Sequence, residues 1–337
     1  MRIIVDAFGG DNAPLAILQG CEMAVREYGV DILAVGSEKT IREVCGKNNI
    51  SLDRISIIDV EKVMPVEVDA AEVVKSYDDS TLAVGLKMLA NREGDAYVSA
   101  GSTGAVTVGA SLFVKRIKGI KRAALATIIP NANGCYMLID IGANKECRPE
   151  MLVQFGIMGS AYMEHIIGVK SPRVGTINIG AEDNKGLDLQ KNANEQMKHA
   201  PINFIGNVEP RYLPQGACDV AVCDGFTGNV VLKLTEGLGK WFANELKGIF
   251  MESAASKLGY LFVKGGVSNF KSKMDYKEYG GAPLMGISRP VIKAHGSSDA
   301  RAFKNAIRQA KEYTERGVIA QIESSLEQMK QRAVEQD

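Results

Sequence analysis

The residue types best suited to chemistry in this chain lie in glycine-rich polar turns, and each turn follows a short apolar run typical of a β-strand. Glycines in such turns let main-chain amides approach an anion, and a following helix adds the partial positive charge of its N-terminus. One such turn is weak evidence, because every α/β protein uses Gly, Asn and Ser in its turns. Several together predict a shared anion pocket beyond the strand ends. The turns are Asp6–Asp11, Ser99–Ala105, Asp140–Asn144, Asn178–Glu182 and Asp224–Asn229.

The turn Ser99–Ala105 fits an anion site best, because a strand, glycines with hydroxyl side chains and a helical pattern follow one another there. None of the turns has the Gly-x-x-x-x-Gly-Lys-Ser/Thr spacing of a nucleotide P-loop, and none is a full Gly-x-Gly-x-x-Gly after the first strand. We therefore predict that phosphate or substrate, rather than a nucleotide, contacts these turns. The predicted binding residues are Asp6, Gly9, Gly10, Gly101, Ser102, Thr103, Gly104, Asn144, Thr227 and Gly228.

Four further residues are candidates for catalysis. Lys185 lies just past a strand end and can pair with phosphate as a point charge, although a solvated turn lysine is an equal alternative. Asp224 and Asn229 flank a turn that enters a predicted helix; helix capping accounts for one of them, which leaves the other to face an oxyanion or orient a partner. His295 lies in a polar turn before a helix, whereas the other histidines lie within helical patterns, and a structural turn histidine is its alternative role.

The elements that must position these residues alternate between short β-branched runs and longer amphipathic stretches. This alternation predicts crossover units and a three-layer α/β/α fold with a largely parallel sheet. The predicted strands are Ile3–Asp6, Ile32–Val35, Ile55–Ile58, Ala96–Ser99, Ala124–Ile129, Tyr136–Ile141, Arg173–Ile179 and Val220–Cys223. The predicted helices include Pro14–Tyr28, Thr81–Asn91, Thr103–Lys115, Met151–Ile166 and Leu187–His199.

The segment Asn131–Gly134 stands between two predicted strands and indicates a hairpin turn, so one antiparallel pair is expected mid-chain. A length of 337 residues suits one two-lobed α/β unit. Because neither a repeat nor a low-complexity linker interrupts the pattern, we expect the lobes to be interwoven. The second lobe is expected at approximately 122–290, including an exposed helical segment at 238–275.

Composition indicates a soluble cytoplasmic protein. Lys and Arg together number 40 and balance 40 Asp and Glu, which argues against nucleic-acid binding. The N-terminus does not resemble a signal peptide, and no run of about 18 apolar residues predicts a membrane span.

The cysteines lack metal-site spacing, so buried reduced thiols are expected rather than disulfides. Cys147 and Cys223 lie near the polar turns, but no histidine is adjacent to activate either thiol. No carboxylate cluster at helical spacing predicts a metal site.

A long apolar helical face follows residue 230, and a segment rich in Leu, Phe and Lys then spans Leu258–Lys273. This segment is interpreted as an exposed helical hairpin or an interface. Burial in the core and contact with anionic lipid are the alternatives. The residues expected to touch a membrane are Leu258, Leu261 and Phe262.

The same turns carry a resemblance to a known family. The motifs DAFGGD, SAGSTGA, DIGAN, NIGAE with NKG, FIGNVE, CDGFTGN and YGGAPLMG with KAHGSS stand in the order seen in bacterial phosphate acyltransferases of fatty acid and phospholipid synthesis (the PlsX family). The match extends from Asp6 to about Ile307, and the ordered set is specific although any one motif is not. Phe8 stands where the family has Met, Ala181 where it has an acidic residue, and Glu146 where it has Asp.

The resemblance implies transfer of a fatty acyl group from acyl-(acyl carrier protein) to inorganic phosphate, which gives acyl phosphate without a cofactor. It also implies a fold similar to isopropylmalate dehydrogenase and phosphate acetyltransferase. A homodimer is implied, as is peripheral association of the cytoplasmic enzyme with the anionic inner face of the membrane. The last point favours membrane contact at Leu258, Leu261 and Phe262.

The candidate residues suit this reaction. Amides of Ser102–Gly104 and the charge of Lys185 can hold phosphate, Asn229 can face the oxyanion, and His295 can orient phosphate or protonate the departing thiolate. A metal- and nicotinamide-dependent dehydrogenase of the same fold is one alternative, but paired acidic ligands on a helix are not evident. A non-enzymatic carrier-protein or membrane scaffold is the other, and it would have no use for an anion pocket.

Overall fold

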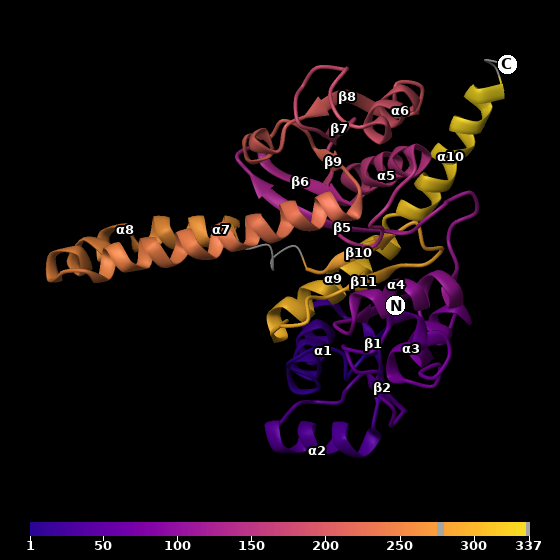
Figure 1. The fold of residues 1–337 in the computed structure, drawn as a ribbon. Coiled ribbons are helices and arrows are strands. Elements are labelled where there is room, and N and C mark those ends of the chain that lie inside the picture. Colours follow the sequence, from indigo (N-terminus) through magenta and orange to yellow (C-terminus); the bar gives the residue numbers. More distant parts are fainter. Residues whose placement is uncertain (275–279, 335–337) are drawn as a thin grey trace.

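The protein is built around one eleven-stranded sheet covered by helices, in a computed structural model that describes residues 1–274 and 280–334 (Figure 1). The strand order is β3-β2-β1-β4-β11-β10-β5-β6-β9-β7-β8. The strands are β1 (Arg2–Asp6), β2 (Asp31–Gly36), β3 (Ile55–Asp59), β4 (Ala96–Ser99), β5 (Ala124–Asn131), β6 (Gly134–Ile139), β7 (Arg173–Ile177), β8 (Asn203–Val208), β9 (Val220–Val222), β10 (Ala282–Met285) and β11 (Val291–Lys293). The α-helices are α1 (Leu15–Tyr28), α2 (Glu38–Asn48), α3 (Thr81–Ala90), α4 (Thr103–Gly109), α5 (Pro149–Tyr162), α6 (Asp188–Met197), α7 (Gly225–Met251), α8 (Ala254–Met274), α9 (Ala300–Glu315) and α10 (Val318–Val334).

Two parallel sets of strands make up the sheet, and an antiparallel centre joins them. The strands β3, β2, β1, β4 and β11 run in one direction. The strands β6, β9, β7 and β8 run together in the opposite direction, because the pairs β11–β10, β10–β5 and β5–β6 are all antiparallel. The predicted α/β architecture with a largely parallel sheet is confirmed. The hairpin predicted at Asn131–Gly134 is also confirmed, since these two residues pair at the turn of β5–β6.

Three strands, β8, β10 and β11, lie outside the predicted set. In β8 the apolar alternation is interrupted by Gly206, near which the pairing with β7 shifts register. The strands β10 and β11 are too short for periodicity to reveal them, and β10 contains Pro283. The strand β7 ends at Ile177, two residues earlier than predicted, where the side chain of Asn178 accepts a hydrogen bond from the next amide.

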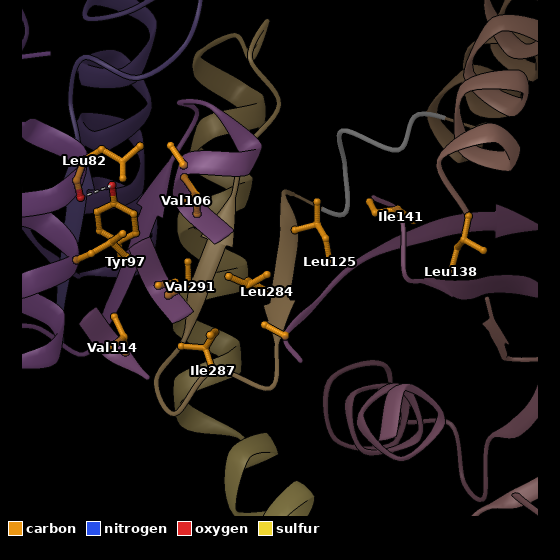
Figure 2. Close-up of a cluster of buried hydrophobic side chains, with 14 of the residues drawn as sticks. Leu82, Tyr97, Val106, Val114, Leu125, Leu138, Ile141, Leu284, Ile287 and Val291 are labelled. Atoms are coloured by element: carbon orange, nitrogen blue, oxygen red, sulfur yellow. Dashed lines mark hydrogen bonds between the residues drawn. The ribbon is translucent and has the colours of Figure 1, made fainter. Parts of the chain in front are cut away.

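A shared hydrophobic core holds the two parallel sets together (Figure 2). Tyr97 of β4 is fully buried and donates its hydroxyl to the main-chain carbonyl of Leu82 at 3.3 Å. Leu284 of β10, Leu125 of β5 and Leu138 of β6 belong to the same cluster. Burying each leucine contributes roughly 2 kcal/mol, so this cluster fixes the relative positions of both sets and the antiparallel centre.

The C-terminal part of the chain packs on both halves of the molecule. Helix α9 lies against α1 in the first half, and α10 lies against α5 in the second half. Gly317, with φ of 67°, makes the break between α9 and α10. Late segments of the chain therefore contact both early and middle ones, and interwoven lobes stay a prediction. The lobe boundaries at approximately 122–290 stay a prediction.

Helices α7 and α8 form a hairpin that projects from the sheet (Figure 1). The rings of Phe250 and Tyr260 pack across it with centroids 5.1 Å apart. Helices α7 and α8 cover the segment predicted at 238–275 apart from residues 252–253, and residue 275 lies outside the described residues; its place in a second lobe stays a prediction. Within the described part of the chain, no helix is both long enough and apolar enough to cross a membrane. Exposed apolar side chains on the hairpin include Leu234, Leu238, Trp241, Phe242, Ile249, Leu258, Leu261 and Phe262.

Candidate active site

The ends of β1 and β4 place a buried carboxyl group against two glycine-rich turns. Asp6 is fully buried and accepts a hydrogen bond of 2.8 Å from the hydroxyl of Ser99, which in turn accepts one of 3.0 Å from the amide of Gly101. A Cβ added to Gly9 would lie 2.6 Å from both the Asp6 carboxylate and the Gly101 nitrogen, so only glycine allows this approach. Burial raises the pKa of Asp6, and the hydrogen bonds from Ser99 and Thr81 oppose that rise. These predicted binding residues therefore do meet in space.

A buried lysine that the sequence reasoning did not select lies beside this cluster. Lys293 ends β11 and is 7% exposed, and its ammonium group donates to the carbonyl oxygens of Ala100 and Ala294. Burial lowers the pKa of Lys293 to about 8, while the carboxylates of Asp11 and Asp6 act in the opposite direction. The sequence feature that could have indicated this buried lysine is its position inside the apolar run Val291–Ala294.

The lowered pKa of Lys293 makes a prediction about stability. The folded-state pKa is about 8 and the ordinary value 10.5, so between these pH values the unfolded chain binds more protons than the folded chain. The contribution of Lys293 to stability therefore rises with pH across that window, by up to roughly 3 kcal/mol. Urea unfolding of the wild type and Lys293→Met at pH 7.5, 9 and 10.5 measures it. A difference between the two proteins that does not change with pH would contradict the prediction.

His295 lies at the surface, two residues after β11. The amide of Ser297 donates to its Nδ1 atom at 3.2 Å, so the neutral imidazole carries its proton on Nε2. Partial desolvation lowers the pKa of His295; Lys233, Lys293 and Lys240 add to that effect, and Glu236 opposes it. Lys233 and Glu236 belong to α7, so this helix brings charge from the second half of the chain to His295.

In the second half, the loop after β6 is organised by Asp140. Its buried carboxylate accepts hydrogen bonds from the amides of Leu125, Gly142, Ala143 and Asn144, and from the Asn144 side chain. The same side-chain nitrogen of Asn144 donates to the carbonyl of Ala123 at 2.7 Å. The amide donors of Asn144 therefore hold this loop in place. Their role in substrate binding stays a prediction.

This loop packs directly on the start of α7. The amide of Gly225 donates to the carbonyl of Asn144 at 2.7 Å. Asp224 is the N-cap of α7, accepting from both the amide and the hydroxyl of Thr227 at 2.9 and 2.8 Å. Capping therefore accounts for Asp224 rather than Asn229. Asn229 is exposed and lies beside Gly142 across the junction of loop and helix.

A third cluster lies after β7 and β8. Lys185 is exposed, and its carbonyl accepts a hydrogen bond from the side chain of Asn178 at 3.1 Å. The side chain of Asn178 also donates to Asn207 at 2.8 Å, and Asn207 donates to the carbonyl of Glu182 at 2.8 Å. Two asparagines that sequence reasoning did not select thus position the turn that carries Lys185.

The turn Ser102–Gly104 begins α4 as predicted. The hydroxyl of Ser102 caps the helix by accepting from the amide of Ala105, and Thr103 and Gly104 are exposed. The cavity beside β1 has a volume of about 150 Å³ and includes Asp6, Gly9, Gly10 and Gly101 among its lining residues. Lys185, Asn229 and His295 lie outside that lining. The predicted residues therefore fall into three clusters. One lies at the ends of β1 and β4, one at the Asp140 loop with the start of α7, and one at the turn that carries Lys185. Helix α7 begins at the second cluster and passes near His295.

Comparison with known proteins identifies the family. The model of a family described as fatty acid synthesis protein matches residues 1–321. Phosphate acyltransferase from Clostridium novyi (strain NT) is 46% identical over 329 residues, covering 97% of this chain and 99% of that protein. Phosphate acyltransferase from Alkaliphilus oremlandii (strain OhILAs) is 45% identical over 322 residues, covering 96% of each. The chain belongs to the phosphate acyltransferase family of fatty acid synthesis.

The fold of this phosphate acyltransferase is similar to that of other enzymes of known structure. A phosphotransacetylase from Streptococcus pyogenes aligns with a TM-score of 0.66 at 15% identity, covering 93% of this chain and 94% of that chain. The EutD phosphotransacetylase from Staphylococcus aureus aligns with a TM-score of 0.62 at 17% identity, with the same coverage. These likenesses show the fold that was predicted.

The two thiols near the predicted site, Cys147 and Cys223, are poorly suited to act as nucleophiles. Burial raises the pKa of Cys147 to about 12, with Asp140 and Asp224 adding to the effect, and burial also raises the pKa of Cys223. Neither thiol is therefore a ready nucleophile at neutral pH. Across residues 1–274 and 280–334, no three His, Cys, Asp or Glu side chains are grouped as a metal site would require. Lys185, Asn229 and His295 stay the predicted residues for catalysis.

Proposed function

We propose that this acyltransferase moves a fatty acyl group from the thioester of an acyl carrier protein to inorganic phosphate. A phosphate oxygen attacks the thioester carbonyl, the carbon–sulfur bond breaks, and the products are acyl phosphate and the free carrier thiol. The relatives named phosphate acyltransferase support the acceptor. The observation that supports the mechanism is the course of α7: Asn229 lies in its first turns beside Gly142 of the Asp140 loop, and Lys233 and Glu236 further along the helix affect the pKa of His295.

Each side chain has a distinct role in this proposal. Lys185 holds the phosphate through its charge, and Asn229 with neighbouring main-chain amides faces the developing oxyanion. His295, neutral at pH 7, donates a hydrogen bond from its Nε2–H group to a phosphate oxygen and orients the phosphate, and the departing thiolate takes its proton from the attacking phosphate or from water. Phosphate is already partly dianionic at that pH, so no strong base is needed, and no cofactor or metal is proposed.

The proposal is tested by following free thiol release from acyl-(acyl carrier protein) with and without phosphate. The expected result is thiol release that saturates with phosphate and yields acyl phosphate in equal amount. Equal release without phosphate would overturn the proposed reaction. A protein that binds the carrier protein without consuming the thioester would support the scaffold alternative.

We also propose that the protein is a homodimer that associates peripherally with the anionic inner face of the membrane from the cytoplasm. The support for membrane association is the α7–α8 hairpin, on which many large apolar side chains are exposed. Leu258, Leu261 and Phe262 are 60%, 66% and 86% exposed, and lysines stand nearby at 257 and 264. An apolar patch beside basic residues suits an anionic lipid surface.

The membrane proposal makes a direct prediction. The pair Leu258→Glu and Phe262→Glu should lower binding to anionic phospholipid vesicles about tenfold or more, because two charges then replace inserted apolar groups. Turnover in solution should stay unchanged. Vesicle flotation measures the binding, and Leu112→Glu, which changes an exposed leucine on the body of the protein, serves as the control. Unchanged flotation of the double variant would remove the patch from consideration.

A further inference from the structure

The residues that line the cavity beside the end of β1 are of two chemical kinds, and each set is called here one half of the lining. Its polar half is formed by Asp6, Thr81 and the glycine-rich bends at Gly9, Gly10 and Gly101. Its apolar half is formed by Phe8, Val63, Met64, Pro65, Val66 and Leu82. The mechanism proposed above uses none of the apolar residues. A cavity lined by both polar and apolar residues fits a ligand that has a polar head and a hydrocarbon body.

The charges around this cavity do not suit phosphate. The carboxyl group of Asp6 stands in the polar wall, and a carboxylate there would repel a phosphate dianion. The ammonium group of Lys293 bonds to the carbonyls of Ala100 and Ala294, and Lys293 is not among the residues that line the cavity. An uncharged acyl group meets no such repulsion.

The apolar half is partly open to solvent. Val63 and Val66 are 39% and 58% exposed, whereas Met64 between them is 7% exposed. Leaving these valines uncovered costs free energy that a bound hydrocarbon would recover, at about 25 cal/mol for each Å² covered. Their exposure therefore favours an apolar occupant that enters between them.

Phe8 forms part of the apolar lining and packs on the first parallel set of strands. The ring of Phe8 lies against Gly36 of β2, where an added Cβ would stand 2.2 Å from the Phe8 Cε2 atom. The glycine thus leaves the space that the ring occupies, and Phe8 is also among the residues that line the cavity. A change in the size of the side chain at position 8 is therefore expected to change the space in the cavity.

We propose that the apolar half of this cavity binds the part of the acyl chain next to the thioester carbonyl, and that Phe8 and Val66 determine which acyl groups fit. This inference rests on the proposed function. A volume of about 150 Å³ holds about five groups the size of a water molecule, at ~30 Å³ each. It therefore takes the first carbon atoms of a chain, and the rest of a long chain leaves past Val63 and Val66.

The first test reduces the space in the cavity through Gly36→Ala, a substitution outside the lining that acts on Phe8. Gly36→Ala places a methyl group against Phe8 and pushes the ring inward, so the KM for hexadecanoyl-(acyl carrier protein) should rise at least fivefold while the KM for phosphate stays within twofold. Adding Phe8→Ala in the same chain removes the ring and should restore the KM for the thioester. Phe8→Ala alone should raise the kcat/KM of a thioester branched near the carbonyl relative to a straight one. Thermal melting confirms that each variant is folded.

A second pair of variants tests the acyl cavity independently, in case Gly36→Ala does not fold. Val66→Trp fills the mouth of the cavity and should raise the KM for the thioester about tenfold, whereas Glu67→Trp adds the same bulk to a neighbour that does not line the cavity. Equal effects of the two tryptophans, or a raised KM for phosphate with Val66→Trp, would overturn the acyl pocket. Absence of phosphate-dependent turnover in the wild type would instead overturn the proposed function.

Discussion

Replacement of Gly228 by alanine is expected to destabilise the protein by about 3 kcal/mol and to lower kcat/KM by 10²-fold or more. An added Cβ at this position would lie 1.8 Å from the carbonyl oxygen of Asp140 and 2.9 Å from the sulfur of Cys223. No rotamer relieves the contact, because both the methyl carbon and the carbonyl belong to rigid parts of the chain. The start of α7 must therefore move off the Asp140 loop. That movement displaces Asn229 from Gly142.

Urea unfolding and steady-state kinetics measure the two effects. Gly237→Ala is the matched control, because it lies in the same helix and its added methyl group would have no other described residue within 4 Å beyond the helix's own neighbouring turns. Alanine there should leave turnover unchanged and stabilise the helix by up to about 1 kcal/mol. Wild-type stability and turnover in Gly228→Ala would show that the contact between α7 and the Asp140 loop is not needed.

Loss of the charge at Lys185 is expected to lower kcat/KM for phosphate by about 10²- to 10³-fold, since a charged donor aimed at the reacting anion is worth that much. The side chain is exposed and lies in the turn that Asn178 and Asn207 hold. Lys185→Ala should therefore unfold at the same temperature as the wild type. Initial rates over a range of phosphate concentrations separate the change in KM from the change in kcat.

Lys191→Ala is the control for this prediction, because Lys191 is an exposed lysine on the helix that follows the same turn. It should leave the kinetics for phosphate unchanged. Lys185→Arg keeps the charge but not its compact shape, so partial recovery is expected. If Lys185→Ala and Lys191→Ala have the same rate, Lys185 is an ordinary solvated lysine, which was the alternative interpretation of its position.

If the acyl cavity is as proposed, Lys185→Ala and Val66→Trp should change different kinetic constants. Lys185→Ala acts on the phosphate side, whereas Val66→Trp acts on the thioester side. Because Lys185 is outside the lining that contains Val66, their effects on kcat/KM should add within about 0.5 kcal/mol. Strong non-additivity would mean that both substrates share one space.

Local pattern was sufficient to predict the turns and the strands that carry them. The strand ends at Asp6 and Ser99 and the hairpin at Asn131–Gly134 depend on residue type and on neighbours close in sequence. Those are properties that alternation, glycine content and turn chemistry report directly. Family membership was likewise readable from ordered motifs, because their order does not depend on how the chain folds in space.

The tertiary structure alone decided how the turns are grouped. The short strands β10 and β11 insert between the two halves and reverse the direction of the second set, so the strand ends do not form one uniform row. The burial of Lys293, the contact of Gly228 with Asp140 and the approach of α7 to His295 each join residues far apart in sequence. Such contacts follow from packing over the whole sheet, and no local periodicity encodes which distant side chain will fill a given space.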